Sequence, residues 1–283
     1  MQITNHHIVE NTIILKSQQG LIDRINLLEN SVKAHQEAAI ETGKALSREK
    51  DINATKSRFV SIASHEFRTF LTRIYLSASL IKDYQHRLDQ QKIATHLEKI
   101  KIAVGDLTAI LDDFLSVEKI DSRKVFPVYE PFDLKLLAEE VIDDMELLLK
   151  PGQIINHQHT GTGCVVNLDK KMLKHCIVNL VSNAMKYSGS AAIINVSTAV
   201  QDDQCYIHVE DNGIGIPRED QKLLFTAFFR ANNTSNIQGT GLGLNIVQRY
   251  TELMQGKVTL KSTEDIGTLF MLSFPSSPSP ILA

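Results

Sequence analysis

The sequence contains little cysteine, no tryptophan and no long apolar run. Its three cysteines, Cys164, Cys176 and Cys205, form no CxxC pair and leave one thiol over, which argues against a disulfide framework and against a zinc module. This usage favours a reducing, cytoplasmic setting. The first residues, MQITNHHIVE, lack a basic segment followed by a hydrophobic one, so we expect no membrane segment in this chain. Because the chain opens in a mid-helix pattern, a fragment with an upstream membrane or sensor region stays open as an alternative.

The sequence also lacks a strong excess of charge of either sign. Lys and Arg together number 30 and Asp and Glu 33, for a formal net charge of -3. No global basic field is therefore available to hold nucleic acid or an anionic membrane. With 283 residues, 43% of them hydrophobic, the chain is long enough for two modest domains and a helical extension.

Residues 1–53 show apolar positions at seven-residue steps, which is typical of a coiled coil. One row contains Ile14, Leu21 and Leu28, and the other contains Ile25, Val32, Ala39 and Leu46. We expect this segment to be a signalling helix that pairs in parallel with a second copy of the chain.

Residues 54–121 show two further helical patterns, separated by the polar stretch 85–91. Two such helices form a hairpin that exposes too much apolar surface for a monomer. We therefore expect a homodimer in which two hairpins form a four-helix bundle.

Residues 122–132 look like a linker, because the helical pattern lapses there and Pro127 and Pro131 bracket an aromatic-containing turn. In residues 133–275, strands alternate with helices in an order that predicts an α/β sandwich with a mostly antiparallel sheet. The whole chain is thus expected to be of the α+β class, with residues 276–283 as a frayed tail.

A first chemical signal is the stretch DNGIGIP, residues 211–217, which follows the alternating strand pattern CYIHVED. A carboxylate at a strand end, Asp211, can accept a hydrogen bond from an exocyclic amine, and nearby glycines let the backbone approach a flat ligand. An ordinary glycine-rich turn would look the same.

A second signal is GTGLGL, residues 239–244, before the helical run NIVQRYTEL. Backbone N–H groups in a glycine turn at a helix N-terminus can bind phosphate oxygens. The stretch has neither the GK[ST] of a P-loop nor the GxGxxG pattern, and a flexible loop is the alternative reading.

A third signal is the helix KHCIVNLVSNAMKYS, which places Asn179, Asn183, Lys186 and Tyr187 on one face. Amides in a helix interior need partners, and their oxygens suit Mg²⁺, with Lys186 supplying charge to phosphates. A solvated Asn-rich face is the alternative. A fourth signal, His65 beside Glu66 in SHEFRT, is weak by itself.

In this order, the four signals resemble the sensor histidine kinases of two-component systems over roughly residues 54–275. FVSIASHEFRTFLT resembles their H box, NLVSNAMKYS the N box, DNGIGIP the first G box, LFTAFFR the F box and GTGLGLNI the second G box. Five ordered blocks make a chance match very improbable.

The resemblance implies an ATP-binding domain of the type shared with heat-shock chaperones and gyrase. Asp211 would then recognise the adenine amine, and Asn183, with Asn179 close by, would hold Mg²⁺. The remaining nucleotide-binding positions implied by the resemblance are Lys186, Tyr187, Gly213, Gly215, Phe225, Arg230, Gly239, Gly241, Gly243 and Leu244. Among these, Lys186 and Arg230 would face the phosphates, and the three glycines from 239 to 243 would form a lid hinge.

The resemblance also implies that His65 is the phosphoacceptor, that Glu66 accepts the proton of its other ring nitrogen and that Thr69 orients water for dephosphorylating a response regulator. The phosphoryl group would pass to an aspartate of that regulator. The family usually has proline directly after this element, whereas this chain has Phe70, which restores a backbone hydrogen bond and removes a bend.

Two alternatives differ from this reading. Another ATPase or protein kinase of the same superfold would need the Asn and Gly boxes but not the H box. A non-catalytic dimeric scaffold would tolerate loss of Asn183 or of the glycines, all of which are present.

Overall fold

A computed structural model describes residues 64, 67–83, 89–122, 124–161, 163–234, 237 and 239–277, together with scattered residues between 24 and 43. The chain divides into two compact units, Met1–Val60 and Ser61–Ala283. In the first unit the described residues are helical, and Leu28 and Val32 are exposed by 58% and 54%. Most of the expected coiled coil lies outside the described residues, so it stays a prediction.

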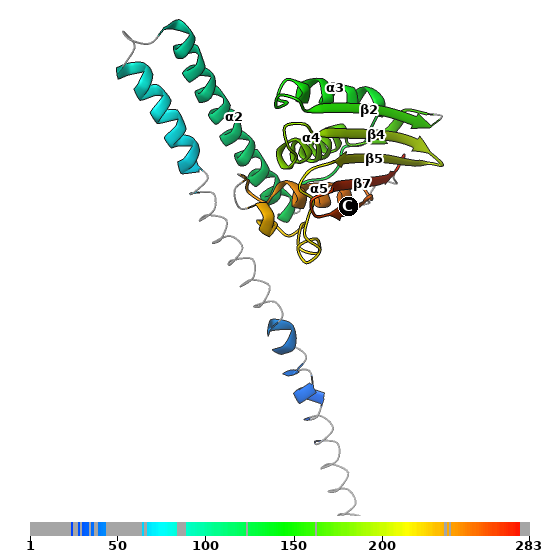
Figure 1. Ribbon diagram of the computed structural model, residues 1–283. Coiled ribbons are helices and arrows are strands. Elements are labelled where there is room, and N and C mark those ends of the chain that lie inside the picture. The colour runs from blue at the N-terminus through cyan, green and yellow to red at the C-terminus, as the bar shows by residue number, and fades with distance from the viewer. Residues whose placement is uncertain are drawn as a thin grey trace, which may run out of the picture. The chain divides into compact units, whose positions relative to one another are not determined.

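The second unit begins with the helical hairpin that the sequence predicts. Residues 67–83 are helical, and the second helix, α2, spans Gln90–Asp121 (Figure 1). α2 starts where the carboxylate of Asp89 accepts a hydrogen bond from the backbone N–H of Lys92 at 2.7 Å, as a helix N-cap requires. Phe70, Ser77, Ala103 and Val117 are buried.

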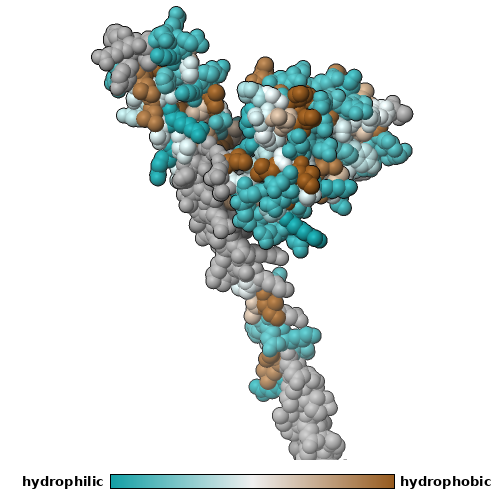
Figure 2. All heavy atoms as spheres, viewed as in Figure 1, coloured by the Kyte–Doolittle hydropathy of each residue, from teal (hydrophilic) through white to brown (hydrophobic). Residues whose placement is uncertain are grey.

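A second row on α2 faces solvent in the single chain. Leu97, Val104 and Leu111 follow one another at seven-residue steps and are 55%, 47% and 46% exposed. Figure 2 shows apolar side chains on the hairpin among hydrophilic ones. This row is the apolar surface from which the sequence predicts a four-helix bundle.

The rest of the unit is a two-layer α/β sandwich. Its sheet has the order β2-β4-β5-β7-β6, with β2 parallel to β4 and the other pairs antiparallel. The strands are β2 (Ile154–Gly161), β4 (Ile193–Gln201), β5 (Gln204–Asp211), β6 (Lys257–Thr263) and β7 (Gly267–Pro275). A separate two-stranded sheet pairs β1 (Glu130–Asp133) with β3 (Val165–Leu168).

Three helices cover the inner face of the large sheet: α3 (Leu134–Glu146), α4 (Lys170–Tyr187) and α5 (Gly243–Leu253) (Figure 1). Alternate strand residues point toward them, and fully buried Ile194, Ile207 and Phe274 pack in one core with Leu173 and Ile177 of α4. Each such side chain contributes roughly 1.5–3 kcal/mol by leaving water. A short 3-10 helix, η1 (Asn232–Thr234), follows the loop after β5.

The α+β class and the mostly antiparallel sheet are confirmed. The apolar pattern that includes KHCIVNLVSNAMKYS predicts a helix over residues 170–187, and α4 has these bounds. The sequence missed β2, whose residues INHQHTG carry polar side chains on both faces, and it missed β1. β1 takes in three residues, 130–132, that the sequence assigned to the linker.

Candidate active site

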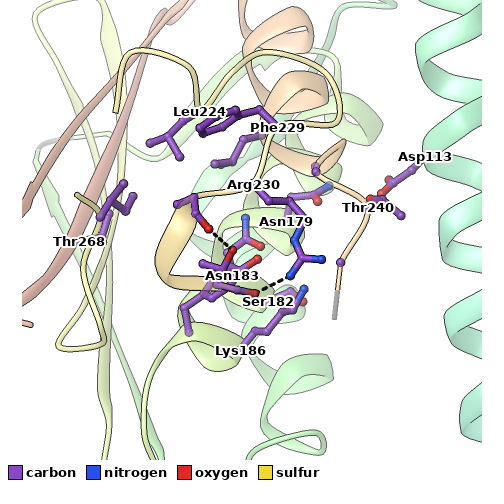
Figure 3. A pocket seen from close by; sticks show the side chains of 18 of the residues that line it. Asp113, Asn179, Ser182, Asn183, Lys186, Leu224, Phe229, Arg230, Thr240 and Thr268 are labelled. Carbon is purple, nitrogen blue, oxygen red and sulfur yellow. Dashed lines mark hydrogen bonds between the residues drawn. The ribbon is translucent and has the colours of Figure 1, made fainter. Parts of the chain in front are cut away.

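A cavity of about 430 Å³ lies between α4, the end of β5 and the loops that lead to α5. Figure 3 shows Asn183 and Lys186 of α4 facing the loop that carries Arg230. Thr268 lies across from them on β7. The structure brings most of the predicted binding residues to this cavity, namely Asn179, Asn183, Lys186, Tyr187, Asp211, Gly215, Arg230, Gly239, Gly241, Gly243 and Leu244.

Helix α4 supplies the polar side chains of one wall. It begins where the Asp169 carboxylate accepts a hydrogen bond from the N–H of Met172 at 2.9 Å, and its apolar face packs into the core. Asn179 donates its amide hydrogen to the carbonyl of His175 at 3.2 Å. A Cβ added at Gly243 would strike the amide oxygen of Asn179, so the Asn179 side chain would have to move to make room for it.

Lys186 and Tyr187 form the last turn of α4. The Lys186 ammonium lies 5.1 Å from the centre of the Tyr187 ring, within the range of a cation–π contact. Burial raises the pKa of the Tyr187 hydroxyl, against the opposing charge of Arg230. The glycine-rich loop passes close by, since a Cβ at Gly239 would lie 2.5 Å from Lys186 Nζ.

Asp211 ends β5 at the opposite wall. Its carboxylate accepts the backbone N–H of Gly213 at 2.8 Å. Burial raises the pKa of Asp211 to about 6, and this effect outweighs the hydrogen bonds from the backbones of Gly213 and Thr268, which lower it; the charge of Glu210 raises it further. An ionised carboxylate here can accept a hydrogen bond from an amine of a bound ligand.

Gly213 lies beside the end of α4 rather than in the cavity wall. The neighbouring N–H of Ile214 donates to the carbonyl of Tyr187 at 3.1 Å. A Cβ at Gly213 would come within 2.5 Å of that same carbonyl oxygen. The glycine therefore allows the loop after β5 to approach α4.

Arg230 lines the cavity but also holds the loop that follows it. Its Nη2 donates to the carbonyl of Thr234 at 2.5 Å and to the carbonyl of Ile237. Among the described atoms, its buried Nε has no hydrogen-bond partner. Contact of Arg230 with phosphates stays a prediction.

The F-box loop is tied to α5 and to the glycine-rich loop. Phe225 lies outside the cavity wall, and its carbonyl accepts the side-chain amide of Asn245 at 2.7 Å. Phe228 donates its backbone N–H to the carbonyl of Gly241 at 3.0 Å. Phe228 and Gly241 have φ values of 64° and 71°, in the left-handed region.

The predicted phosphoacceptor region is described only in part. His65 and Glu66 lie outside the described residues, so their roles stay predictions. Thr69 is helical and half-buried, and Phe70 beside it is buried with the Arg73 guanidinium 5.7 Å from its ring centre.

Several cavity residues were missed by the sequence reasoning. Ser182 lies on α4 between Asn179 and Asn183, and its position on the helix could have indicated it. The hairpin contributes Asp106 and Asp113, which no local pattern marks. Burial raises the pKa of Asp106, opposed by the charges of Arg73 and Lys186, while Asp113 lies 3.3 Å from the ring nitrogen of His175.

A carboxylate at a strand end, an asparagine helix and a glycine-rich loop around one cavity define an ATPase-type α/β sandwich. Comparison with known families agrees. Residues 168–278 match the family described as "Histidine kinase-, DNA gyrase B-, and HSP90-like ATPase", and residues 55–123 match "His Kinase A (phospho-acceptor) domain".

Individual relatives are named as sensor or histidine kinases. The chain is 28% identical over 260 residues to the sensor protein kinase PmrB of Pseudomonas aeruginosa, covering 92% of this chain and 50% of that protein. It spans 51% and 34% of two other curated relatives.

Two solved structures share the fold. Full-length ShkA in complex with AMPPNP has a TM-score of 0.57 at 22% identity, over 77% of this chain and 45% of that chain. Histidine kinase ThkA in complex with response regulator protein TrrA has a TM-score of 0.53 at 20% identity, over 75% and 59%.

The chain therefore belongs to the sensor histidine kinases of two-component systems. The resemblance that its sequence motifs indicate is confirmed. Within the described part of the chain, the helices are too short or too polar to cross a bilayer.

Proposed function

We propose that this chain uses ATP to phosphorylate its own His65 and passes the phosphoryl group to an aspartate of a response regulator. One observation carries the proposal: Asp211 of β5 and Asn183 and Lys186 of α4 line a single cavity, in a chain whose upstream hairpin carries the SHEFRT element. The alternative superfold ATPases do not account for that element.

The cavity residues fit a nucleotide with a divalent cation. The half-buried Asp211 carboxylate suits the adenine amine, and the amide oxygens of Asn183 and Asn179 are ligands of the hard type that Mg²⁺ takes. Bound Mg²⁺ would neutralise charge on the phosphates. Lys186 would add positive charge, and Gly239, Gly241 and Gly243 would let the loop close over them.

In the first step, a neutral ring nitrogen of His65 forms a bond to the γ-phosphorus, the bond from that phosphorus to the bridging oxygen breaks, and ADP leaves. Glu66 would accept the proton of the other ring nitrogen. In the second step, a carboxylate oxygen of the regulator's aspartate forms a bond to that phosphorus, the N–P bond to His65 breaks, and the imidazole is released. Thr69 would orient water when the regulator is dephosphorylated.

Incubation with γ-labelled ATP tests the proposal. The wild-type chain should gain label that is acid-labile and base-stable, as expected of a phosphohistidine. His65→Gln should lose the label and retain ATP binding measured by calorimetry. Label that persists in this variant would contradict the assignment of His65.

The setting of this activity completes the proposal. We propose a homodimer that acts in the cytoplasm, alone or as the cytoplasmic part of a membrane sensor. The domain bounds of 1–53, 54–121, 122–132, 133–275 and 276–283 are proposed with it. The response regulator as partner is supported by the complex of ThkA with TrrA, a kinase of the same fold.

A further inference from the structure

The last turn of α4 carries Lys186 and Tyr187 into the cavity, so its position sets where both side chains lie. Helix C-termini leave four carbonyls without partners inside the helix. Here the following residue, Ser188, is extended, with φ of -106° and ψ of 157°. The carbonyls at the end of α4 must therefore find their partners elsewhere in the fold.

Two of these partners are contributed by nearby segments. The Ser188 hydroxyl donates to the carbonyl of Ala184, and the N–H of Ile214 donates to the carbonyl of Tyr187. The carbonyls between them, at Met185 and Lys186, take their hydrogen bonds from a turn more than thirty residues earlier in the chain.

That turn is Lys150–Gln153, between α3 and β2. Lys150 Nζ donates to the carbonyls of Met185 at 2.9 Å and Lys186 at 3.3 Å. Gln153 Nε2 donates to the carbonyl of Met185 at 2.8 Å and to that of Gly189 at 3.1 Å. The ammonium also lies at the negative end of the α4 dipole, which favours a cation.

The Lys150–Gln153 turn is built to hold these two side chains in place. The N–H of Gln153 donates to the carbonyl of Lys150 at 3.0 Å, with Pro151 second and Gly152 third at φ of 87°, the pattern of a type II turn. The N–H of Lys150 in turn donates to the Gln153 side-chain oxygen at 3.1 Å. Gln153 is only 6% exposed.

We propose that Lys150 and Gln153 are positioning residues for the nucleotide site, which act by fixing the last turn of α4 and with it Lys186 and Tyr187. This inference rests on the proposed function. Neither residue lines the cavity, so each acts through the backbone of α4. Together they join the α3–β2 turn to the helix that carries the asparagines.

The test compares ATP dissociation constants of the full chain, measured with a fluorescent ATP analogue well below the melting temperature of each variant. Lys150→Met and Gln153→Met keep the side-chain volume and remove the donors. Each should raise the dissociation constant about five- to tenfold, since carbonyls lose partners that a buried helix end needs. Lys150→Arg, which keeps a cationic donor, should stay within about twofold of wild type.

Lys135→Met is the matched control, because Lys135 is an exposed lysine at the start of α3. Its ammonium lies 3.7 Å from Glu139. This variant should leave affinity unchanged. A double-mutant cycle then separates an effect on the position of the α4 side chains from a general loss of stability. If Lys150 acts through Lys186 and Tyr187, adding Lys150→Met to a chain with both Lys186→Ala and Tyr187→Ala should cost less than about twofold.

The outcomes are distinct. A wild-type chain that binds no ATP overturns the proposed function, and this inference with it. ATP binding by wild type with both Met variants within about twofold overturns the inference alone. So do fully additive losses in the cycle, or an Arg variant as weak as the Met variant.

Discussion

The backbone N–H of Ile214 donates to the carbonyl of Tyr187, 3.1 Å away, and joins the loop after β5 to the end of α4. Together with the core between α4 and the sheet, this bond helps to fix the distance between the two walls of the cavity, because Asp211 lies just before the loop and Lys186 just before Tyr187. The site is therefore assembled by backbone contacts behind its side chains.

Gly213→Ala should disturb this junction. The new Cβ would lie 2.5 Å from the Tyr187 carbonyl oxygen and 2.7 Å from a carboxylate oxygen of Asp211. We expect a loss of about 1–3 kcal/mol in unfolding free energy, as for overpacking, and weaker ATP binding. Gly189→Ala is the control, since a Cβ there meets nothing within 4 Å. Chemical denaturation and calorimetry measure both effects, and a stable, tightly binding Gly213→Ala variant would contradict the account.

ATP binding should weaken as the pH falls through about 6. Burial raises the pKa of Asp211 to about 6. Both carboxylate oxygens can accept a hydrogen bond from an amine when the group is ionised, whereas protonation occupies one of them. One pH unit below that pKa, affinity should be about tenfold lower than at pH 8. The phosphates of ATP also titrate near pH 6, so Asp211→Asn is the reference. If its affinity follows the same pH curve as wild type, the carboxyl is not the titrating group.

Asn183→Ala should weaken binding of Mg-ATP far more than binding of metal-free ATP. The amide oxygen is the group that would ligate the cation, while the adenine contact at Asp211 stays intact. Calorimetry with and without Mg²⁺ measures the difference. Equal losses in the two titrations would indicate that Asn183 has a purely structural role.

The hairpin should dimerise through its exposed row on α2. Replacing Leu97 and Leu111 together by Glu places charges in the expected bundle and should shift the chain toward monomer. Leu148→Glu is the control, because Leu148 is 64% exposed on the α3–β2 segment. Sedimentation at micromolar concentration measures the state, and a monomeric wild-type chain would rule out the dimer.

Phe70→Pro should raise the autophosphorylation rate, with ATP affinity changed no more than in Phe70→Ala. Proline in a helix interior costs roughly 3 kcal/mol of helix stability and bends the helix. The first hairpin helix should then favour a bent form over a straight one. We expect the bent form to be the one in which His65 is phosphorylated. Radiolabel time courses give the rate, and calorimetry gives the affinity.

Phe70→Ala separates the backbone effect from loss of the ring. Phe70 is 3% exposed and lines the cavity, so its ring also contributes packing. Alanine removes the ring and keeps the N–H. An unchanged or lower rate in the proline variant, or an equal rise in the alanine variant, would show that helix bending does not limit the chemistry.

The hairpin and α4 could be predicted from sequence because their apolar residues repeat with helical spacing. α4 also has an N-cap at Asp169. β2 could not, since His157 and His159 occupy inward positions that apolar residues usually take and bond with the Thr198 hydroxyl instead. That arrangement depends on β4, to which β2 pairs.

The chemical groups of the site were predictable, but their supports were not. Asp211 and Asn183 occur in motifs with local meaning. Lys150 and Gln153 lie 35 and 32 residues before Met185 and touch it only in the folded chain. Asp106 is another example, since only the tertiary fold brings it to the cavity.

The left-handed backbone at Phe228 stores conformational energy where the F-box loop meets the glycine-rich loop. A non-glycine residue in this conformation is disfavoured by roughly 1–2 kcal/mol, and Phe228 adopts it while its N–H bonds to the Gly241 carbonyl. The lid proposed for Gly239, Gly241 and Gly243 would have to break that bond in order to open. Relaxation of Phe228 would then offset part of the lost hydrogen bond, so opening would need less energy than the contacts of the loop alone suggest.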